Sequence, residues 1–138
     1  MINQVIGDTS AIVALLRQNE RHHEWASDIF RAAPKPILTC EAVISESCFL
    51  LGCHRGGEKA VLDRIADGIL KIEFSISTEV ERVIRLMSKY SDLPMSFADA
   101  CLVRMSESIP ASAVFTLDSD FLIYRKLGKQ EIPLILPK

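Results

Sequence analysis

Several features that mark other classes of protein are missing from this sequence of 138 residues. The first residues, MINQVIGDTS, lack the basic segment followed by an apolar segment that marks a secretory signal. No apolar run approaches the roughly 18 residues that a membrane-spanning helix needs. The chain also has no internal repeat and no low-complexity tract. We therefore expect a cytoplasmic globular protein that has no membrane partner.

Cysteine pairs of the C-x-x-C type are absent as well, although the chain has four cysteines. Without an export signal, these thiols are expected to be reduced and buried in the core. An alternative is a zinc site built from Cys48, Cys53 and His54, but these residues lack the paired ligand spacing of zinc-binding motifs. The other two cysteines are Cys40 and Cys101.

A large excess of charge of either sign is also missing, because the net charge is only −2. The chain therefore has no overall basic surface, and a nucleic-acid partner would have to be attracted by a local feature. The composition itself is 49% hydrophobic and 25% charged. These proportions, at this length, predict a single globular domain over residues 1–138 with a sizeable core.

Short apolar runs alternate with longer helical patterns along the whole chain. Strands that alternate with helices indicate right-handed βαβ units and a mostly parallel sheet. We therefore expect a three-layer α/β/α sandwich. The expected strands are 1–6, 37–39, 69–74, 113–117 and 132–136, and the expected helices are 11–17, 22–33, 42–53, 58–67, 78–90 (with Thr78 and Glu81 as a capping box), 97–107 and 118–127.

Acidic residues follow two of the expected strands. Asp8 comes after the first strand, and Asp118 and Asp120 come after the strand at 113–117. In parallel α/β folds, ligands bind beyond the carboxyl ends of the strands, where the strand order reverses. These acidic residues are therefore candidates for an active site.

Two further carboxylates lie in helical patterns. Glu46 interrupts an apolar helix and needs a partner, whereas the nearby Glu41 is favoured at its helix start by the helix dipole. Ser96 and Asp99 have the spacing of a capping box, and taken alone Asp99 is more readily interpreted as a cap. Carboxylates that converge repel one another unless a cation lies between them. With oxygen ligands only, the expected cation is Mg²⁺ or Mn²⁺.

Four segments resemble the motifs of the PIN-domain family, in particular the VapC-type toxins: DTSAIVALL, TCEAVISESCFLL, YSDLPMSFADACLV and FTLDSDFLIYR. The resemblance covers the whole chain. It implies a metal-dependent endoribonuclease, the toxin of a toxin–antitoxin pair, which hydrolyses RNA phosphodiesters with metal-activated water. The implied cofactor is Mg²⁺, with Mn²⁺ as an alternative.

The resemblance also implies roles for single residues. The catalytic and metal-binding positions are taken by Asp8, Glu46, Asp99 and Asp118. Asp120 is a candidate for a residue that contacts these metal ligands rather than the metal itself. Many relatives carry another acid where this chain has Ser96, so a second metal ion would be held weakly or not at all. The hydroxyls of Thr9, Ser10 and Thr116 would orient carboxylates or waters, unless they serve as local caps.

The family further implies a homodimer, for which Trp25, Phe30 and Leu51 are the expected apolar surface residues, and a small antitoxin partner. An alternative is a catalytically weak PIN scaffold that binds RNA or protein, which the change at Ser96 keeps open. A phospho-accepting receiver domain is disfavoured, because ILKIEFS has no Asp and IPLILP has no Lys.

Overall fold

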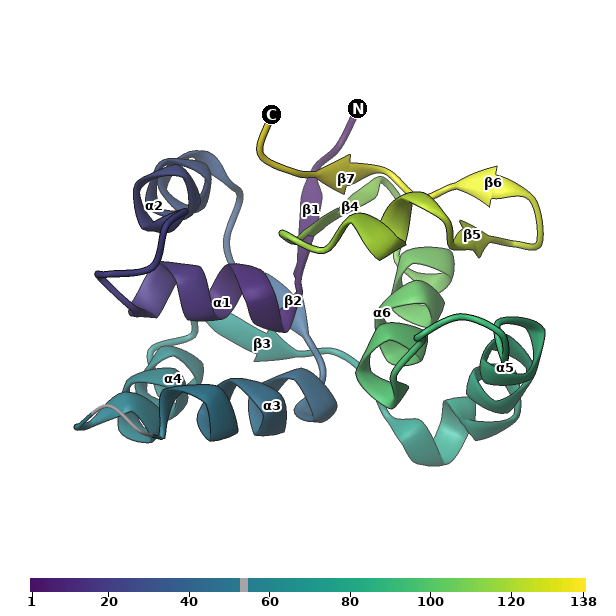
Figure 1. The fold of residues 1–138 in the computed structure, drawn as a ribbon, viewed down its shortest axis with the longest axis horizontal. Coiled ribbons are helices and arrows are strands. Elements are labelled where there is room, and N and C mark those ends of the chain that lie inside the picture. Colours follow the sequence, from purple (N-terminus) through teal and green to yellow (C-terminus); the bar gives the residue numbers. More distant parts are fainter. Residues whose placement is uncertain (53–54) are drawn as a thin grey trace.

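A parallel sheet of five strands, in the order β3-β2-β1-β4-β7, forms the centre of the computed structural model (Figure 1). All four pairings in this sheet are parallel. The structure describes residues 1–52 and 55–138, so Cys53 and His54, two ligands of the alternative zinc site, lie outside the described residues. The strands are β1 (Gln4–Gly7), β2 (Ile37–Thr39), β3 (Leu70–Ile72), β4 (Ser112–Phe115) and β7 (Leu134–Ile135).

Helices cover both faces of this sheet, and the expected three-layer α/β/α sandwich is confirmed. Helices α1 to α4 lie on one side, and α5 and α6 lie on the other (Figure 1). This division follows from right-handed crossovers, because the chain moves outward from β1 to β3 and then returns across the sheet to β4. The helices are α1 (Thr9–Leu16), α2 (His23–Ala32), α3 (Glu41–Leu51), α4 (Gly57–Ala66), α5 (Ile76–Lys89) and α6 (Phe97–Ser108).

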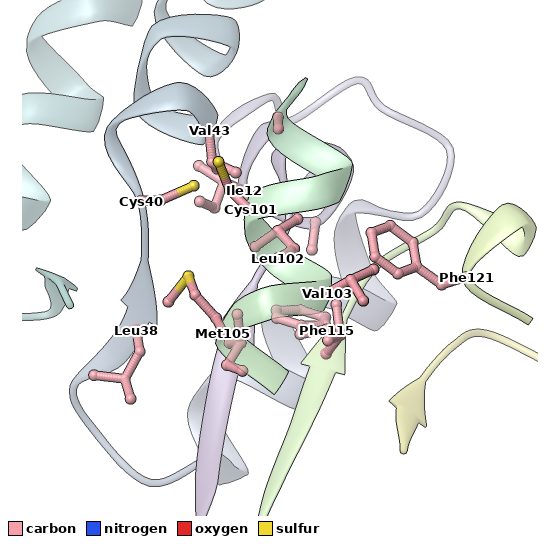
Figure 2. Packing of buried hydrophobic residues seen from close by; sticks show 14 of the residues in the cluster. Ile12, Leu38, Cys40, Val43, Cys101, Leu102, Val103, Met105, Phe115 and Phe121 are labelled. Atoms are coloured by element: carbon pink, nitrogen blue, oxygen red, sulfur yellow. The ribbon is translucent and has the colours of Figure 1, made fainter. Parts of the chain in front are cut away.

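Helix α6 is the most deeply buried helix, and it packs against the sheet with apolar side chains such as Leu102 and Met105 (Figure 2). Eight of its twelve residues are buried, because the helix is enclosed between the sheet and α5. Cys40 and Cys101 point into the same cluster, where both are free and buried. Cys48 is free and half-buried. The expectation of unpaired thiols therefore holds for the three described cysteines.

Two expected elements were wrong in detail. Helix α5 begins at Ile76 with Ser75 as its N-cap, so the expected capping box of Thr78 and Glu81 does not form. The Thr78 hydroxyl instead donates to the carbonyl of Ser75 at 3.1 Å.

The expected helix at 118–127 is only a 3-10 turn, η1 (Ser119–Leu122), and a hairpin of β5 (Arg125–Lys126) and β6 (Gln130–Glu131) follows it. Leu127 and Gly128, with φ of 51° and 86°, turn this hairpin in the left-handed region, where glycine is favoured.

Of the expected apolar surface residues, Leu51 was wrong, because it is a core residue. Trp25 and Phe30 are half-buried and pack against the core. The exposed apolar side chains lie elsewhere, for example Ile84 on α5 and Phe49 on α3. Among the described residues, no helix combines the length and apolar character needed to cross a membrane.

Candidate active site

The carboxyl ends of β1 and β4 bring Asp8 and Asp118 to the same edge of the sheet. These two strands are parallel neighbours, and Gly7 is in register with Phe115. The backbone N–H of Asp8 extends the pairing by donating to the carbonyl of Phe115 at 3.0 Å. The chain leaves β1 toward β2 on one side, whereas β4 lies on the other. The strand order therefore reverses here, as expected for a ligand site.

Asp8 is buried and accepts hydrogen bonds on both of its carboxylate oxygens. Oδ1 accepts from the backbone N–H of Thr9 at 2.7 Å, so Asp8 caps α1. Oδ2 accepts from the hydroxyls of Thr116 at 2.6 Å and Ser10 at 3.2 Å. Two of the hydroxyl residues noted in the sequence therefore orient this carboxylate.

Burial nevertheless raises the pKa of Asp8 from 3.8 to about 6. The hydrogen bonds from Thr116, Thr9 and Ser10 lower the pKa, while the negative charge of Asp99 raises it further. Asp8 is only 5% exposed, so its charge is poorly solvated by water. A nearby cation would stabilise this carboxylate.

Glu46 is connected to Asp8 through Thr9. The Thr9 hydroxyl donates to Oε1 of Glu46 at 2.7 Å, while the backbone of Thr9 donates to Asp8. Glu46 itself is exposed, so it does not lie on the buried face of α3, but it does have a hydrogen-bond partner in Thr9. The hydrogen bond to Thr9 is the better reason to prefer it to Glu41, which is also exposed and begins α3.

Asp99 belongs to a true capping box at the start of α6. The Ser96 hydroxyl accepts from the backbone N–H of Asp99 at 3.0 Å, and Oδ2 of Asp99 accepts from the backbone N–H of Ser96 at 3.3 Å. The same Oδ2 accepts a hydrogen bond from the Tyr124 hydroxyl at 3.1 Å. Burial raises the pKa of Asp99, and the charge of Asp118 raises it further against the lowering effect of these hydrogen bonds. The capping role therefore explains only part of its environment.

Asp118 is tied to Asp8 through Thr116. The Thr116 hydroxyl accepts from the backbone N–H of Asp118 at 2.9 Å while it donates to Asp8. Oδ1 of Asp118 accepts from the backbone N–H of Asp120 at 2.8 Å and so caps η1. Asp120 is half-buried in this turn. Thr9 and Thr116 therefore connect Asp8 to Glu46 and to Asp118. Asp99 is coupled to Asp8 and Asp118 by electrostatic repulsion.

Tyr124 is a residue of this site that the sequence did not reveal. It is completely buried, and its pKa is raised by burial and by the charge of Asp99. Its ring packs against Tyr90 at 5.2 Å and against Phe121 at 5.3 Å between centroids. Nothing in the spacing of FLIY marks this role, because the contact with Asp99 depends on the turn at η1.

The donor set fits a hard divalent cation. All four acidic residues offer carboxylate oxygens, which Mg²⁺ and Mn²⁺ prefer. Among the described residues, no protein donor contacts Oε2 of Glu46, Oδ1 of Asp99 or Oδ2 of Asp118. Within the described part of the chain, however, no three His, Cys, Asp or Glu side chains are already arranged as a metal site.

The chain is similar to known proteins in both sequence and fold. Residues 5–127 match the family model of the PIN domain. The chain is 28% identical over 127 residues to Ribonuclease VapC26 of Mycobacterium tuberculosis, an alignment that covers 90% of this chain and 94% of that protein. The fold is similar to the crystal structure of Mycobacterium tuberculosis VapC20, a sarcin-ricin loop cleaving toxin. The TM-score is 0.73 at 21% identity, and the match covers 85% of this chain and 92% of VapC20.

Proposed function

The chain belongs to the PIN domain family, as its motifs predicted, and on that premise we propose that it is a metal-dependent endoribonuclease, the toxin of a toxin–antitoxin pair. The observation that carries the proposal is that Thr9 connects Asp8 to Glu46 and Thr116 connects Asp8 to Asp118. The charge of Asp99 also raises the pKa of Asp8. The relative named as a ribonuclease, which aligns over most of the chain, supports RNA as the substrate.

In this proposal Asp8, Glu46, Asp99 and Asp118 hold Mg²⁺, or alternatively Mn²⁺. When bound, such an ion would supply a water molecule of lowered pKa and positive charge to offset the negative charge of a phosphodiester. The protein side chains supply the positioning. Thr116 and Ser10 hold Asp8, and Tyr124 holds Asp99, so that each carboxylate keeps its orientation while the substrate binds.

The proposed assembly and location follow the family. We expect a homodimer in the cytoplasm that is inhibited by a small antitoxin protein. The exposed apolar side chains of α5 and α3 are available for such contacts. Light scattering at micromolar concentration tests the dimer, and a monomeric mass would contradict it.

Asp99→Asn tests the function most directly. Asparagine keeps an oxygen that can accept the capping hydrogen bond from the backbone, so the fold should be retained. The loss of one negative ligand from so small a set should strongly reduce metal affinity. We expect the wild type to cleave single-stranded RNA with Mg²⁺ or Mn²⁺ and not in excess EDTA, and the variant to lose at least about 100-fold in rate.

Asp92→Asn provides the matched control, because Asp92 is an exposed acid in the loop before α6. It should cleave RNA like the wild type. Added metal should raise the melting temperature of the wild type and of this control, but not of Asp99→Asn. Equal cleavage by all three proteins would leave Asp99 as a cap and favour the alternative of a scaffold that binds RNA or protein without metal-dependent cleavage.

A further inference from the structure

A basic hollow lies between α5 and the β5–β6 hairpin. Its volume is about 370 Å³, and three cationic side chains of α5 line it, namely those of Arg82, Arg85 and Lys89. Their spacing of three and four residues places them in one row along the helix, about 10 Å long at 1.5 Å per residue. All three are exposed.

The cations of this hollow differ from the cations of α2 and α4 that form ion pairs. On α2 and α4, Arg31, Lys59 and Arg64 each form an ion pair within their own helix or at its end. Within residues 1–52 and 55–138, Arg82, Arg85 and Lys89 form no ion pair. An unpaired guanidinium presents its full set of donors to a ligand, and its planar fork suits phosphate oxygens.

The single acidic side chain in the lining, Glu107, does not neutralise this row. Its Oε1 accepts from Arg104 at 3.4 Å, and its Oε2 accepts from the backbone N–H of Leu127 at 2.7 Å. The second contact holds the hairpin turn in place. On the other side of the turn, Nζ of Lys89 donates to the carbonyl of Gly128 at 3.0 Å. The rim of the hollow is therefore fixed before any ligand arrives.

Two tyrosines connect the hollow to the acidic site. Tyr90, at the end of α5, accepts a hydrogen bond on its hydroxyl from the backbone N–H of Arg125 at 2.8 Å. Its ring packs on Tyr124, whose hydroxyl donates to Asp99. The helix and the hairpin that form the hollow are thus both attached to the residue proposed to bind metal. The lining of the hollow is therefore connected to Asp99 through two side chains.

We propose that this hollow binds the phosphate backbone of the RNA substrate, with Arg82 and Arg85 as the principal contacts. The inference rests on the proposed function in taking RNA as the substrate. A chain with a net charge of −2 and an acidic cleft repels a polyanion, so local cations are needed to hold the strand while it is cut. Lys126 and Lys129 of the same hairpin extend the positive surface.

The test compares two double variants that change the net charge equally. Arg82→Glu/Arg85→Glu reverses the row, whereas Arg31→Glu/Lys59→Glu reverses two exposed cations far from it in sequence. Binding to a 20-nucleotide single-stranded RNA is measured in excess EDTA over a range of salt concentrations. We expect the first variant to bind at least about 10-fold more weakly than the wild type, and its salt slope to fall by about 0.7 for each lost contact. The control should remain within about 3-fold of the wild type, and both variants should melt like the wild type.

Equal RNA binding by the two double variants would overturn the proposal, and so would a wild type that does not bind RNA at low salt. The proposal would also fail if Arg82→Glu/Arg85→Glu bound RNA like the wild type but lost binding to an acidic peptide. Cleavage is measured separately with Mg²⁺ and Mn²⁺. If the arginines are needed for RNA binding but neither the wild type nor the variants cleave RNA, the proposed binding site is supported and the proposed nuclease function fails. If the wild type cleaves RNA and Arg82→Glu/Arg85→Glu changes neither RNA binding nor KM, only the proposed RNA-binding site is refuted.

Discussion

The Tyr124 hydroxyl donates a hydrogen bond to Oδ2 of Asp99 at 3.1 Å, and these two residues are 25 positions apart. Asp99 lies in the first turn of α6, whereas Tyr124 lies between η1 and the hairpin, so the bond joins two separate parts of the chain at the acidic site. A buried hydroxyl that donates to a carboxylate favours its charged form. Tyr124 is therefore a positioning residue for Asp99.

Tyr124→Phe tests this role. The ring remains to pack against Tyr90 and Phe121, so the fold should persist with a loss of about 1–2 kcal/mol for the buried hydrogen bond. Loss of the donor raises the pKa of Asp99 further, so the acid limb of the pH–rate profile should move to higher pH. At neutral pH we expect metal-dependent cleavage to fall about 10- to 100-fold.

Tyr90→Phe is the matched control, because it also loses a hydrogen bond of a tyrosine hydroxyl, in this case from the backbone N–H of Arg125, and leaves the hydrogen bonds of Asp99 in place. Its melting temperature should fall similarly while its pH–rate profile stays in place. An unchanged profile in Tyr124→Phe would show that the hydroxyl serves stability alone.

Local patterns were enough to predict most of the fold. The alternation of apolar runs with helical segments predicted the parallel sheet, and the acids at the ends of β1 and β4 followed from that arrangement. The sequence did not reveal the hairpin after η1, because residues 118–127 carry a helical pattern, whereas in the structure β5 pairs with β6 instead. Nor did it reveal Tyr124 or the basic row of α5, which acquire their roles only through tertiary contacts.

The interpretation of Ser96 as a cap yields a separate prediction. Ser96→Ala removes the oxygen that accepts from the backbone N–H of Asp99, and should destabilise the fold by about 1 kcal/mol. Ser96→Asp retains a capping oxygen and should recover most of this loss in urea or thermal unfolding. Cleavage by Ser96→Ala should stay within a few-fold of the wild type. A loss as large as that of Asp99→Asn would instead identify Ser96 as part of the metal site.

Asp8 gives the folded chain a dependence on pH. Its pKa is raised from 3.8 to about 6 on folding, so the folded state binds this proton more tightly than the unfolded state. Protonated Asp8 therefore contributes to the free energy of unfolding. This contribution is fully present below about pH 4 and is lost as the pH rises through about 6. Between those limits, metal-free protein should lose about 3 kcal/mol of unfolding free energy through this group. Burial raises the pKa of Asp99 too, and its contribution has the same sign.

Asp8→Asn isolates this contribution, because asparagine is neutral at every pH and its amide can still exchange hydrogen bonds with Thr9 and Thr116. In EDTA, we expect the variant to be more stable than the wild type at pH 7.5, and this advantage to disappear near pH 4. Urea unfolding at both pH values measures the free energy of unfolding of each protein. Subtracting the wild-type value from that of the variant removes the pH dependence of all other groups. Added Mg²⁺ or Mn²⁺ should reverse the order at pH 7.5, since a metal ion stabilises only the protein that retains the carboxylate. A variant that is less stable than the wild type in EDTA at pH 7.5 would mean that the charge of Asp8 is already well stabilised by its hydrogen bonds. The acidic site would then have no need of a cation to offset the burial of this carboxylate.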